Sequence, residues 1–346
     1  MNKKRNSNIE LLRIIAMILI VLNHLSYHGG GFSQSLGFNH YLNSILICGG
    51  KFGVAIFVII GSFFMIKKSP SVNSIISLWI KTFFVSLFFG VIEIITSGFS
   101  IVSFIKSCLP FFTATLWFVT EYIILMILSP FLNVLINKLS KCQYALLMVI
   151  LLIVCSIIPT LKLGGDIFLN EFVWFIFLYL LVGFLSLHTK ITKMGNKKYY
   201  LIFISLVAYI AICAIICCFG EDYLFIRSSG SFLILVSSIC LFFFAVNFEE
   251  RNNSVINFVA KSTFLVYLLH DNSMRDYIWH NVFKTQLWYD SSYYMLFALI
   301  IICALFSLAI LINMLLDYII KKILNISFIH NFCDKTNSFI SEIGNV

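Results

Sequence analysis

The feature that most constrains this chain is a series of long, uninterrupted apolar runs. Separated by charged or turn-forming residues, they fall at about residues 9–27, 45–66, 75–96, 116–136, 144–158, 172–187, 199–219, 231–246, 255–270 and 293–320. An apolar helix needs about 20 residues to cross a bilayer, whereas the strands of a membrane barrel alternate in polarity over about 10 residues. The runs predict an all-α polytopic membrane helical bundle with about ten transmembrane helices. The ninth run is short enough to be tilted, packed inside the bundle or re-entrant.

Composition excludes the main alternatives to this class. The chain is 60% hydrophobic and 11% charged, unlike an ordinary soluble domain. Glu10 and Arg13 interrupt the first run and no small-x-small cleavage site follows, so we expect a retained helix rather than a signal peptide. Most cysteines lie inside apolar runs, where they act as small hydrophobes, and no Cys-x-x-Cys pair accompanies a histidine at ligand spacing. No metal site is predicted.

Lysine and arginine are unevenly divided between alternate loops, and positive charge favours the cytoplasmic side. With the amino terminus inside, the cytoplasmic residues are Lys3, Lys4, Arg5, Lys67, Lys68, Lys138, Lys141, Lys190, Lys193, Lys197, Lys198, Arg251, Lys261, Lys321, Lys322 and Lys335. The outer ones are Lys51, Lys106, Lys162, Arg227, Arg275 and Lys284, together with acidic residues that include Asp166 and Asp271. We therefore predict cytoplasmic termini, with a membrane domain at residues 1–325 and a short cytoplasmic tail at 326–346. The net charge of +9 then reflects topology and attraction to anionic membrane lipid, not nucleic-acid binding.

The first run carries two polar residues with a suggestive spacing. Arg13 and His24 are separated by ten residues, so a helix returns them to within about 20° of one face, roughly 16 Å apart along its axis. An arginine inside a span costs on the order of 3 kcal/mol by insertion scales, and so is expected to face a polar cavity. The alternative is that Arg13 snorkels or pairs with Glu10, while His24 makes an ordinary contact between helices.

Two further ionisable residues are expected at the depth of His24. Glu121 enters the fourth run about one turn below the outer surface, and His270 ends the ninth run on the same side. A carboxylate beside an imidazole orients the ring and raises its basicity, as a general base requires. Glu121 is thus a candidate orienting partner for His24; the alternatives are a carboxylate at a helix start and an interfacial cap at His270.

Two other strings have structural explanations. The segment His28-Gly29-Gly30-Gly31 is similar to an esterase oxyanion loop, but the chain has no Gly-x-Ser-x-Gly elbow, which favours a flexible outer turn. The Gly61-Ser62 pair is more typical of close helix packing than of a nucleophile.

Several stretches together resemble the membrane acyltransferase-3 family, in which an arginine and a histidine ten residues apart mark the first helix. The stretches that carry the resemblance are Ile9-Glu10-Leu11-Leu12-Arg13 with His24, Gly53-Val54-Ala55-Ile56-Phe57-Val58 with the following small pair, Leu116-Trp117-Phe118 with Ser129-Pro130, and Ser262-Thr263-Phe264-Leu265-Val266-Tyr267-Leu268-Leu269-His270. Two features depart from the family. Its small pair is usually Ser-Gly, where this chain has Gly61-Ser62, and the basic cluster before the third span shrinks to Lys81, with Lys67 and Lys68 nearby.

The resemblance implies a plasma-membrane O-acetyltransferase that uses cytoplasmic acetyl-CoA as donor. The expected acceptor is a hydroxyl of a cell-surface polysaccharide, such as a capsule, or of its lipid-linked precursor. His24, Arg13 and Glu121 are the candidate catalytic residues, and the candidate substrate-binding residues are Trp117, Tyr267, His270 and Lys81.

Two mechanisms and two other functions stay open at this point. His24 acts either as a general base for the acceptor hydroxyl or as the carrier of a covalent acyl-histidine intermediate. Intramembrane Arg, His and Glu also mark transport routes, so a glycan or small-molecule transporter or flippase is the main alternative. The other is a family member that acylates a non-glycan acceptor.

Overall fold

The computed structural model describes residues 5–98, 100–112, 116–161 and 171–344, and this part of the chain is built from helices without a strand. Four predicted charges, Lys3, Lys4, Lys162 and Asp166, lie outside the described residues. Within them, nine helical segments are long and apolar enough to cross a membrane: Ser7–Tyr27, Gly37–Lys67, Val72–Thr96, Trp117–Lys138, Lys141–Thr160, Glu171–His188, Gly195–Phe219, Phe225–Val246 and Tyr294–Leu324. The prediction of an all-α polytopic bundle is confirmed.

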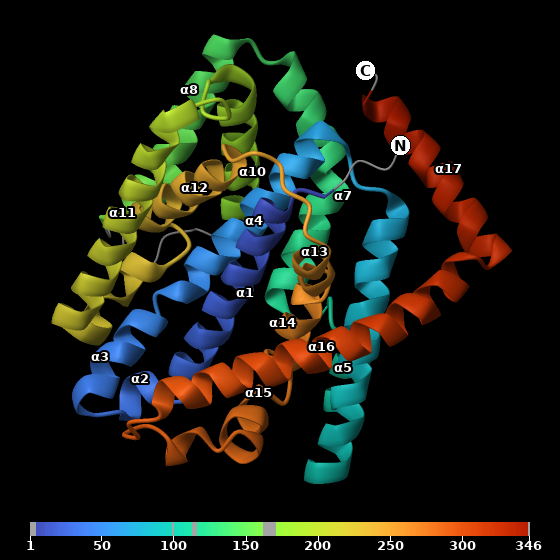
Figure 1. The fold of residues 1–346 in the computed structure, drawn as a ribbon. Helices are drawn as coiled ribbons and strands as arrows, with labels where there is room; N and C mark the ends of the chain where they lie inside the picture. Colours follow the sequence, from blue (N-terminus) through green and yellow to red (C-terminus); the bar gives the residue numbers. More distant parts are fainter. Residues whose placement is uncertain (1–4, 99, 113–115, 162–170, 345–346) are drawn as a thin grey trace.

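The main helices are α1 (Ser7–Tyr27), α3 (Gly37–Leu46), α4 (Gly49–Lys67), α5 (Val72–Ser97), α7 (Trp117–Lys138), α8 (Lys141–Leu152), α10 (Glu171–His188), α11 (Lys198–Phe219), α12 (Phe232–Val246), α13 (Ser254–Ala260), α14 (Thr263–His270), α16 (Tyr294–Leu324) and α17 (Ser327–Gly344). Shorter elements connect them: α2 (Gly31–Gln34), α6 (Ile101–Cys108), η1 (Ile153–Ile157), α9 (Ile158–Thr160), η2 (Gly195–Lys197), η3 (Gly220–Arg227), α15 (Arg275–Tyr277), η4 (Ile278–Val282) and η5 (Thr285–Leu287). α1 and α4 lie at the centre, while α16 crosses the bundle obliquely (Figure 1).

The short ninth run forms a broken helix, α13 followed by α14, that lies along α1 and runs in the same direction (Figure 1). At one end, the Ser7 hydroxyl bonds to the Asn257 side chain at 2.9 Å. At the other, the ring centroids of His24 and His270 are 5.0 Å apart. From Ser7 to His24 the helix α1 rises about 26 Å, most of the roughly 30 Å hydrocarbon thickness. The broken helix therefore crosses the same layer as α1 and supplies a tenth crossing.

Ten crossings return the chain to the side on which it started, and the start of α1 and the end of α17 both lie toward the top of Figure 1. The predicted tail is the helix α17, and its Asn337 side chain accepts a hydrogen bond from the Val72 backbone N–H at 2.9 Å. The start of α5 is thereby fixed to the carboxyl-terminal helix at this end of the bundle.

Close packing of α1 against α4 depends on three glycines near the start of α4. A Cβ atom would lie 2.9 Å from the Leu19 carbonyl oxygen at Gly49, and 2.5 Å from the Asn23 side chain at Gly50. At Gly53 it would lie 2.6 Å from the Ala16 carbonyl oxygen. Small residues let membrane helices approach in this way. The position of α4 therefore holds the middle of α1 firmly, which fixes the polar side chains that α1 carries.

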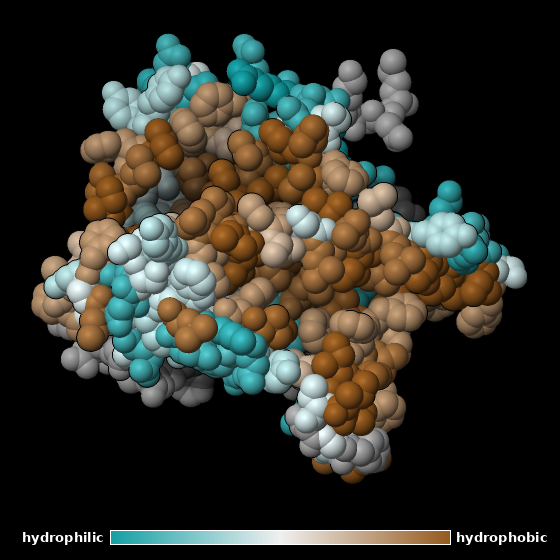
Figure 2. Space-filling view, turned by 60° about the horizontal axis from the view of Figure 1, so that its bottom comes forward, coloured by the Kyte–Doolittle hydropathy of each residue, from teal (hydrophilic) through white to brown (hydrophobic). Residues whose placement is uncertain are grey.

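The outer surface of the bundle is apolar where a bilayer would contact it. Many large hydrophobic side chains are exposed on it, among them Leu311, Met314 and Leu315 of α16. Figure 2 shows hydrophilic side chains gathered over the end that carries α2 and α15, and again at the opposite end, with mainly apolar surface between them. This banded distribution is the one expected for a multi-pass membrane protein.

Candidate active site

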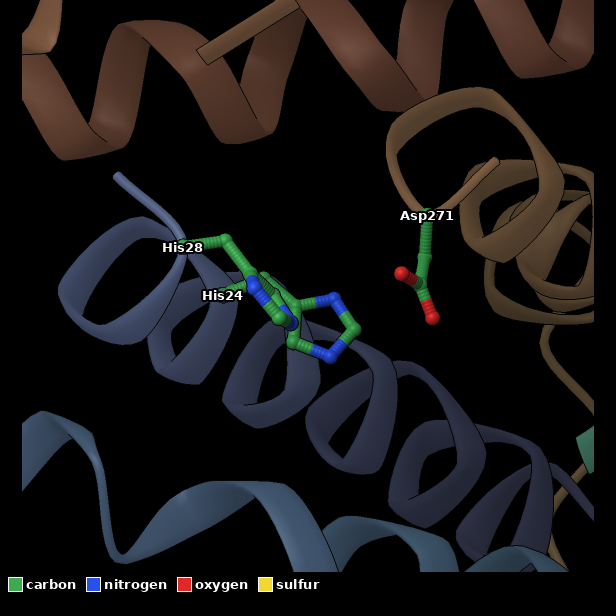
Figure 3. Close-up of side chains that lie close together, drawn as sticks. All are labelled: His24, His28 and Asp271. Carbon is green, nitrogen blue, oxygen red and sulfur yellow. The ribbon is translucent and has the colours of Figure 1, made fainter. Parts of the chain in front are cut away.

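The last turns of α1 and the end of α14 bring three ionisable side chains together. His24 and His28 lie one turn apart on α1 and its carboxyl end, and their ring centroids are 5.0 Å apart. Asp271 follows α14 directly, and its carboxylate faces the two imidazoles (Figure 3). One ligand atom from each of the three residues lies within 4.8 Å of the others. His270, the last residue of α14, adds a third imidazole 5.0 Å from His24 between ring centroids.

The histidine cluster, defined here as His24, His28, His270 and Asp271, contains buried polar atoms without a hydrogen-bond partner among the described residues. They are Nδ1 of His24 and Nε2 of His270, and two neighbouring donors, the Tyr267 hydroxyl and the Trp279 indole N–H, share this property. Leaving such a group unpaired costs about 1–3 kcal/mol, so native proteins seldom do it without a reason. Four such atoms in one region indicate a site that receives a polar ligand.

The protonation of His270 follows from its contact with the backbone. Its Nδ1 lies 2.5 Å from the carbonyl oxygen of Val266, one turn earlier in α14. Because a carbonyl oxygen can only accept, Nδ1 carries the proton and the neutral ring presents Nε2 as an acceptor. His270 therefore offers a fixed acceptor toward the cluster, and Trp279 packs against the same ring with 6.2 Å between centroids.

Asp271 is buried, yet it has a charged partner. The Arg275 guanidinium donates to its carboxylate at 3.1 Å, one helical turn away. Burial by itself raises the pKa of Asp271, but the neighbouring imidazoles of His24 and His270 and the Arg275 guanidinium outweigh that effect and lower it below the usual value. The carboxylate is therefore ionised at neutral pH, and it loses this charge only as the pH falls through the lowered pKa.

Arg13 lies near the other end of α1, at a cavity of about 930 Å³. Its guanidinium donates to the buried carboxylate of Glu10 at 2.9 Å. The same carboxylate lies 3.7 Å from the Arg5 guanidinium. The pairing with Glu10 that the sequence allowed is therefore present, and it holds Arg13 at the cavity wall. The cavity lining is rich in cations and serines: Arg5, Arg13, Lys67, Lys68, Lys193, Ser69, Ser71, Ser74 and Ser186.

A row of aromatic side chains separates this cavity from the histidine cluster. Tyr122 is within electrostatic reach of Arg13, and its ring stacks on Phe118 with 5.6 Å between centroids. Phe118 contacts Tyr267 edge-on at 5.6 Å, and Tyr267 in turn lies 6.2 Å from His270. Phe118 and Tyr267 are both buried. The predicted residue Tyr267 thus lies between the two ends, in contact with the cluster.

Glu121 and Trp117 belong to a different group of side chains. Lys51 lies 4.0 Å from the centre of the Trp117 ring and forms an ion pair with Glu171 at 2.5 Å. Ser229 donates a hydrogen bond to the same Glu171 carboxylate. The charges that act on Glu121 come from Glu171 and Lys51. The structure therefore groups Glu121 with Lys51 and Trp117, whereas the carboxylate that it places beside His24 is Asp271.

Lys81 also has partners away from the cavity. Its ammonium group forms an ion pair with Asp317 of α16 at 2.7 Å and donates to the Asn313 side chain at the same distance. These contacts fix α5 to α16. The cations at the cavity are instead Arg5, Arg13, Lys67, Lys68 and Lys193.

Three residues of this site are not predicted from the sequence. His28 falls in a predicted turn, although it follows His24 by four residues and so shares its helix face. Asp271 and Arg275 fall among the predicted loop charges, although Asp271 is the direct neighbour of His270. The segment from His28 to Gly31 does form a turn, and the Gly29 carbonyl oxygen accepts hydrogen bonds from Thr285 and Tyr289 of the segment between α14 and α16.

The fold and this site define a multi-pass membrane protein with polar chemistry held inside a helical bundle. The chain belongs to the acyltransferase-3 family, since the family model described as an acyltransferase domain matches residues 6–318, from the start of α1 into α16. This confirms the resemblance seen in the sequence, and the protein is a membrane acyltransferase. No match was found among curated proteins or among solved structures.

Proposed function

We propose that this enzyme transfers an acetyl group from cytoplasmic acetyl-CoA to a hydroxyl of a cell-surface polysaccharide or its lipid-linked precursor, in the plasma membrane. The observation that carries the proposal is the arrangement of α1, which presents Arg13 to a basic cavity at one end and His24 to a buried cluster at the other. A donor and an acceptor held at opposite ends of one helix are what a transfer across a membrane requires.

The basic cavity suits the nucleotide end of the coenzyme. Its volume of about 930 Å³ is at the upper end of the range of small-molecule pockets, about 300–1,000 Å³. Lysines act as point charges toward phosphates, and the planar Arg13 guanidinium offers two parallel donors. The long pantetheine arm would extend along the face of α1 toward His24, about 16 Å further along the helix.

At the histidine cluster, His24 would remove the proton of the acceptor hydroxyl while its oxygen attacks the thioester carbonyl. The ionised Asp271 would stabilise the imidazolium that forms, and the CoA thiolate would leave and take up that proton. General-base assistance of this kind contributes about 10²–10⁴-fold. The Tyr267 hydroxyl and the Trp279 indole N–H, which have no hydrogen-bond partner among the described residues, would stabilise the negative charge on the carbonyl oxygen. Transfer through an acyl-histidine uses the same residues and remains the alternative route.

The orientation of the bundle is tested by reporter fusions. Because the basic loops and both termini share one end, fusions after Lys68 and Lys141 should report a cytoplasmic position, and fusions after Ser35 and Lys284 an external one. The readout is paired alkaline phosphatase and fluorescent protein activity at each site. The reverse pattern would place the basic cavity outside and overturn the assignment of the donor.

The function itself is tested by the release of free CoA from acetyl-CoA by purified protein. Release should depend on an added surface glycan, and the O-acetyl signals of the product should appear in its NMR spectrum. A transporter or flippase would move its substrate without consuming acetyl-CoA. Absence of release with every surface glycan tested would therefore favour transport.

Replacing Arg13 by lysine should reduce kcat/KM for acetyl-CoA about tenfold, mainly by raising KM. The ammonium group keeps the charge and the pairing with Glu10, but it loses the planar fork that binds phosphate or carbonyl oxygens in two bonds. Steady-state CoA release at varied acetyl-CoA measures the effect. Lys81→Gln is the matched control, because Lys81 forms an ion pair with Asp317 away from the cavity. The KM of this variant for acetyl-CoA should stay within about twofold of wild type. An equal rise in KM for both variants would contradict the assignment of the cavity.

A further inference from the structure

His28 is the member of the histidine cluster that the proposed reaction does not use. It follows the last turn of α1, its backbone N–H bonds to the His24 carbonyl oxygen at 2.9 Å, and its ring is half-buried. Figure 3 shows both imidazoles projecting from α1 toward the side on which Asp271 lies. A second imidazole facing the proposed base needs a role of its own.

The three side chains have the identity and spacing of metal ligands. Two histidines at i and i+4 on one helix face bind zinc together in other proteins, and a carboxylate from a second element completes a three-ligand set. Their ligand atoms lie within 4.8 Å of one another, whereas zinc at 2.0–2.1 Å from each ligand requires roughly 3.3 Å between them. Closing that difference requires the three side chains to rotate toward one another. His270 is outside this group of three ligands, although its ring centroid lies 5.0 Å from that of His24.

The charges around the site favour a cation once Arg275 is accounted for. The His28 ring is half-buried beside His24, with 5.0 Å between the ring centroids, so a ring nitrogen of His28 can offer a lone pair to a metal held there. Asp271 contributes a negative charge. Arg275 opposes a cation, but its guanidinium binds Oδ1 of Asp271, and Asp276 lies 3.5 Å from the same guanidinium and offsets it. The second carboxylate oxygen of Asp271 is left for the metal.

We infer that His24, His28 and Asp271 form a zinc site at the outer end of the bundle, and that zinc bound there inhibits the enzyme by occupying the lone pair of His24. Inhibition rests on the proposed function, because it assumes that His24 is the base. Binding does not, because it depends on the three ligands alone. The site would let zinc outside the cell suppress acetyl transfer reversibly.

Binding is tested on purified protein with Co²⁺, which substitutes for zinc and absorbs visible light in a tetrahedral site. Wild type should bind about one equivalent with a d–d band that Zn²⁺ removes and Mg²⁺ does not. His28→Phe should lose this band, because a phenyl ring fills the same space without a ligand atom. His40→Phe is the matched control, because His40 lies on α3 beside Phe32, outside the cluster, and should leave the band intact. Equal binding by wild type and His28→Phe would overturn the site.

Inhibition is tested separately by acceptor-dependent CoA release with increasing ZnCl₂. Wild type and His40→Phe should be inhibited, and excess EDTA should restore their activity. His28→Phe, measured relative to its own zinc-free activity, should need at least about tenfold more zinc for half-inhibition. If zinc binds but release is unaffected, the site is not inhibitory. If wild type releases no CoA while Co²⁺ still binds, the proposed function fails and the metal site stands.

Discussion

Replacing His24 by alanine is expected to lower acceptor-dependent CoA release by about 10³-fold while the protein still inserts into the membrane. The substitution removes the general base, or the acyl carrier, from the centre of the histidine cluster. The fold should tolerate it, because Nδ1 of His24 has no hydrogen-bond partner among the described residues and a polar contact between membrane helices contributes only about 1–2 kcal/mol. The measurement is CoA release by purified variant, normalised to the amount of folded protein.

His40→Ala is the matched control for His24→Ala. Both histidines lie toward the same end of the bundle, but His40 packs on Phe32 and lies outside the cluster. Its activity should stay within about twofold of wild type. Full acceptor-dependent release by His24→Ala would eliminate the catalytic assignment.

Incubation with radiolabelled acetyl-CoA and no acceptor distinguishes direct transfer from transfer through an acyl-histidine, because only an acyl-histidine intermediate labels the wild-type chain.

Asp271→Asn is expected to reduce kcat about 100-fold with little change in KM for acetyl-CoA. The amide is nearly the same size as the carboxylate but cannot stabilise the imidazolium that forms at His24. Asp271→Glu keeps the charge and should recover part of the loss. The split between kcat and KM, together with this rescue, separates a role in catalysis from one in folding.

Glu121→Gln is the comparison for Asp271→Asn. Glu121 is the orienting partner that the sequence predicts for His24. Because it is grouped with Lys51 and Glu171, we expect a reduction smaller than tenfold. A larger loss in Glu121→Gln than in Asp271→Asn would return Glu121 to the site as the orienting carboxylate.

The sequence predicts the membrane-spanning helices well because a span can be identified from the apolar composition of a single local segment. The length of the apolar runs gives the helices, and the spacing of Arg13 and His24 gives their shared face on α1. The short run at 255–270 was harder, since its crossing depends on the break between α13 and α14 and on packing against α1. That packing is a long-range property that no local pattern contains.

The partners of the site residues were predicted less well for a geometrical reason. Position along a span gives the depth of a residue in the membrane, but not which neighbouring helix it faces. Glu121 and Asp271 were both assigned to the outer side, yet Asp271 is the one that faces His24 (Figure 3). In the same way, no residue near Lys81 in the sequence indicates that Asp317 is its partner. The fold of α16 brings the Asp317 carboxylate within 2.7 Å of the Lys81 ammonium group.

The aromatic row of Tyr122, Phe118 and Tyr267 has an electrical consequence. A living membrane holds a voltage worth about 2.3 kcal/mol per elementary charge for each 100 mV, and any continuous column of water through it would dissipate that voltage as leaking ions and protons. Close-packed rings between the two ends act as an insulator. In the proposed reaction the uncharged acetyl group and pantetheine arm would pass this insulator while the polyanionic nucleotide end of the coenzyme stayed in the basic cavity. Modifying the cell exterior would then not discharge the membrane.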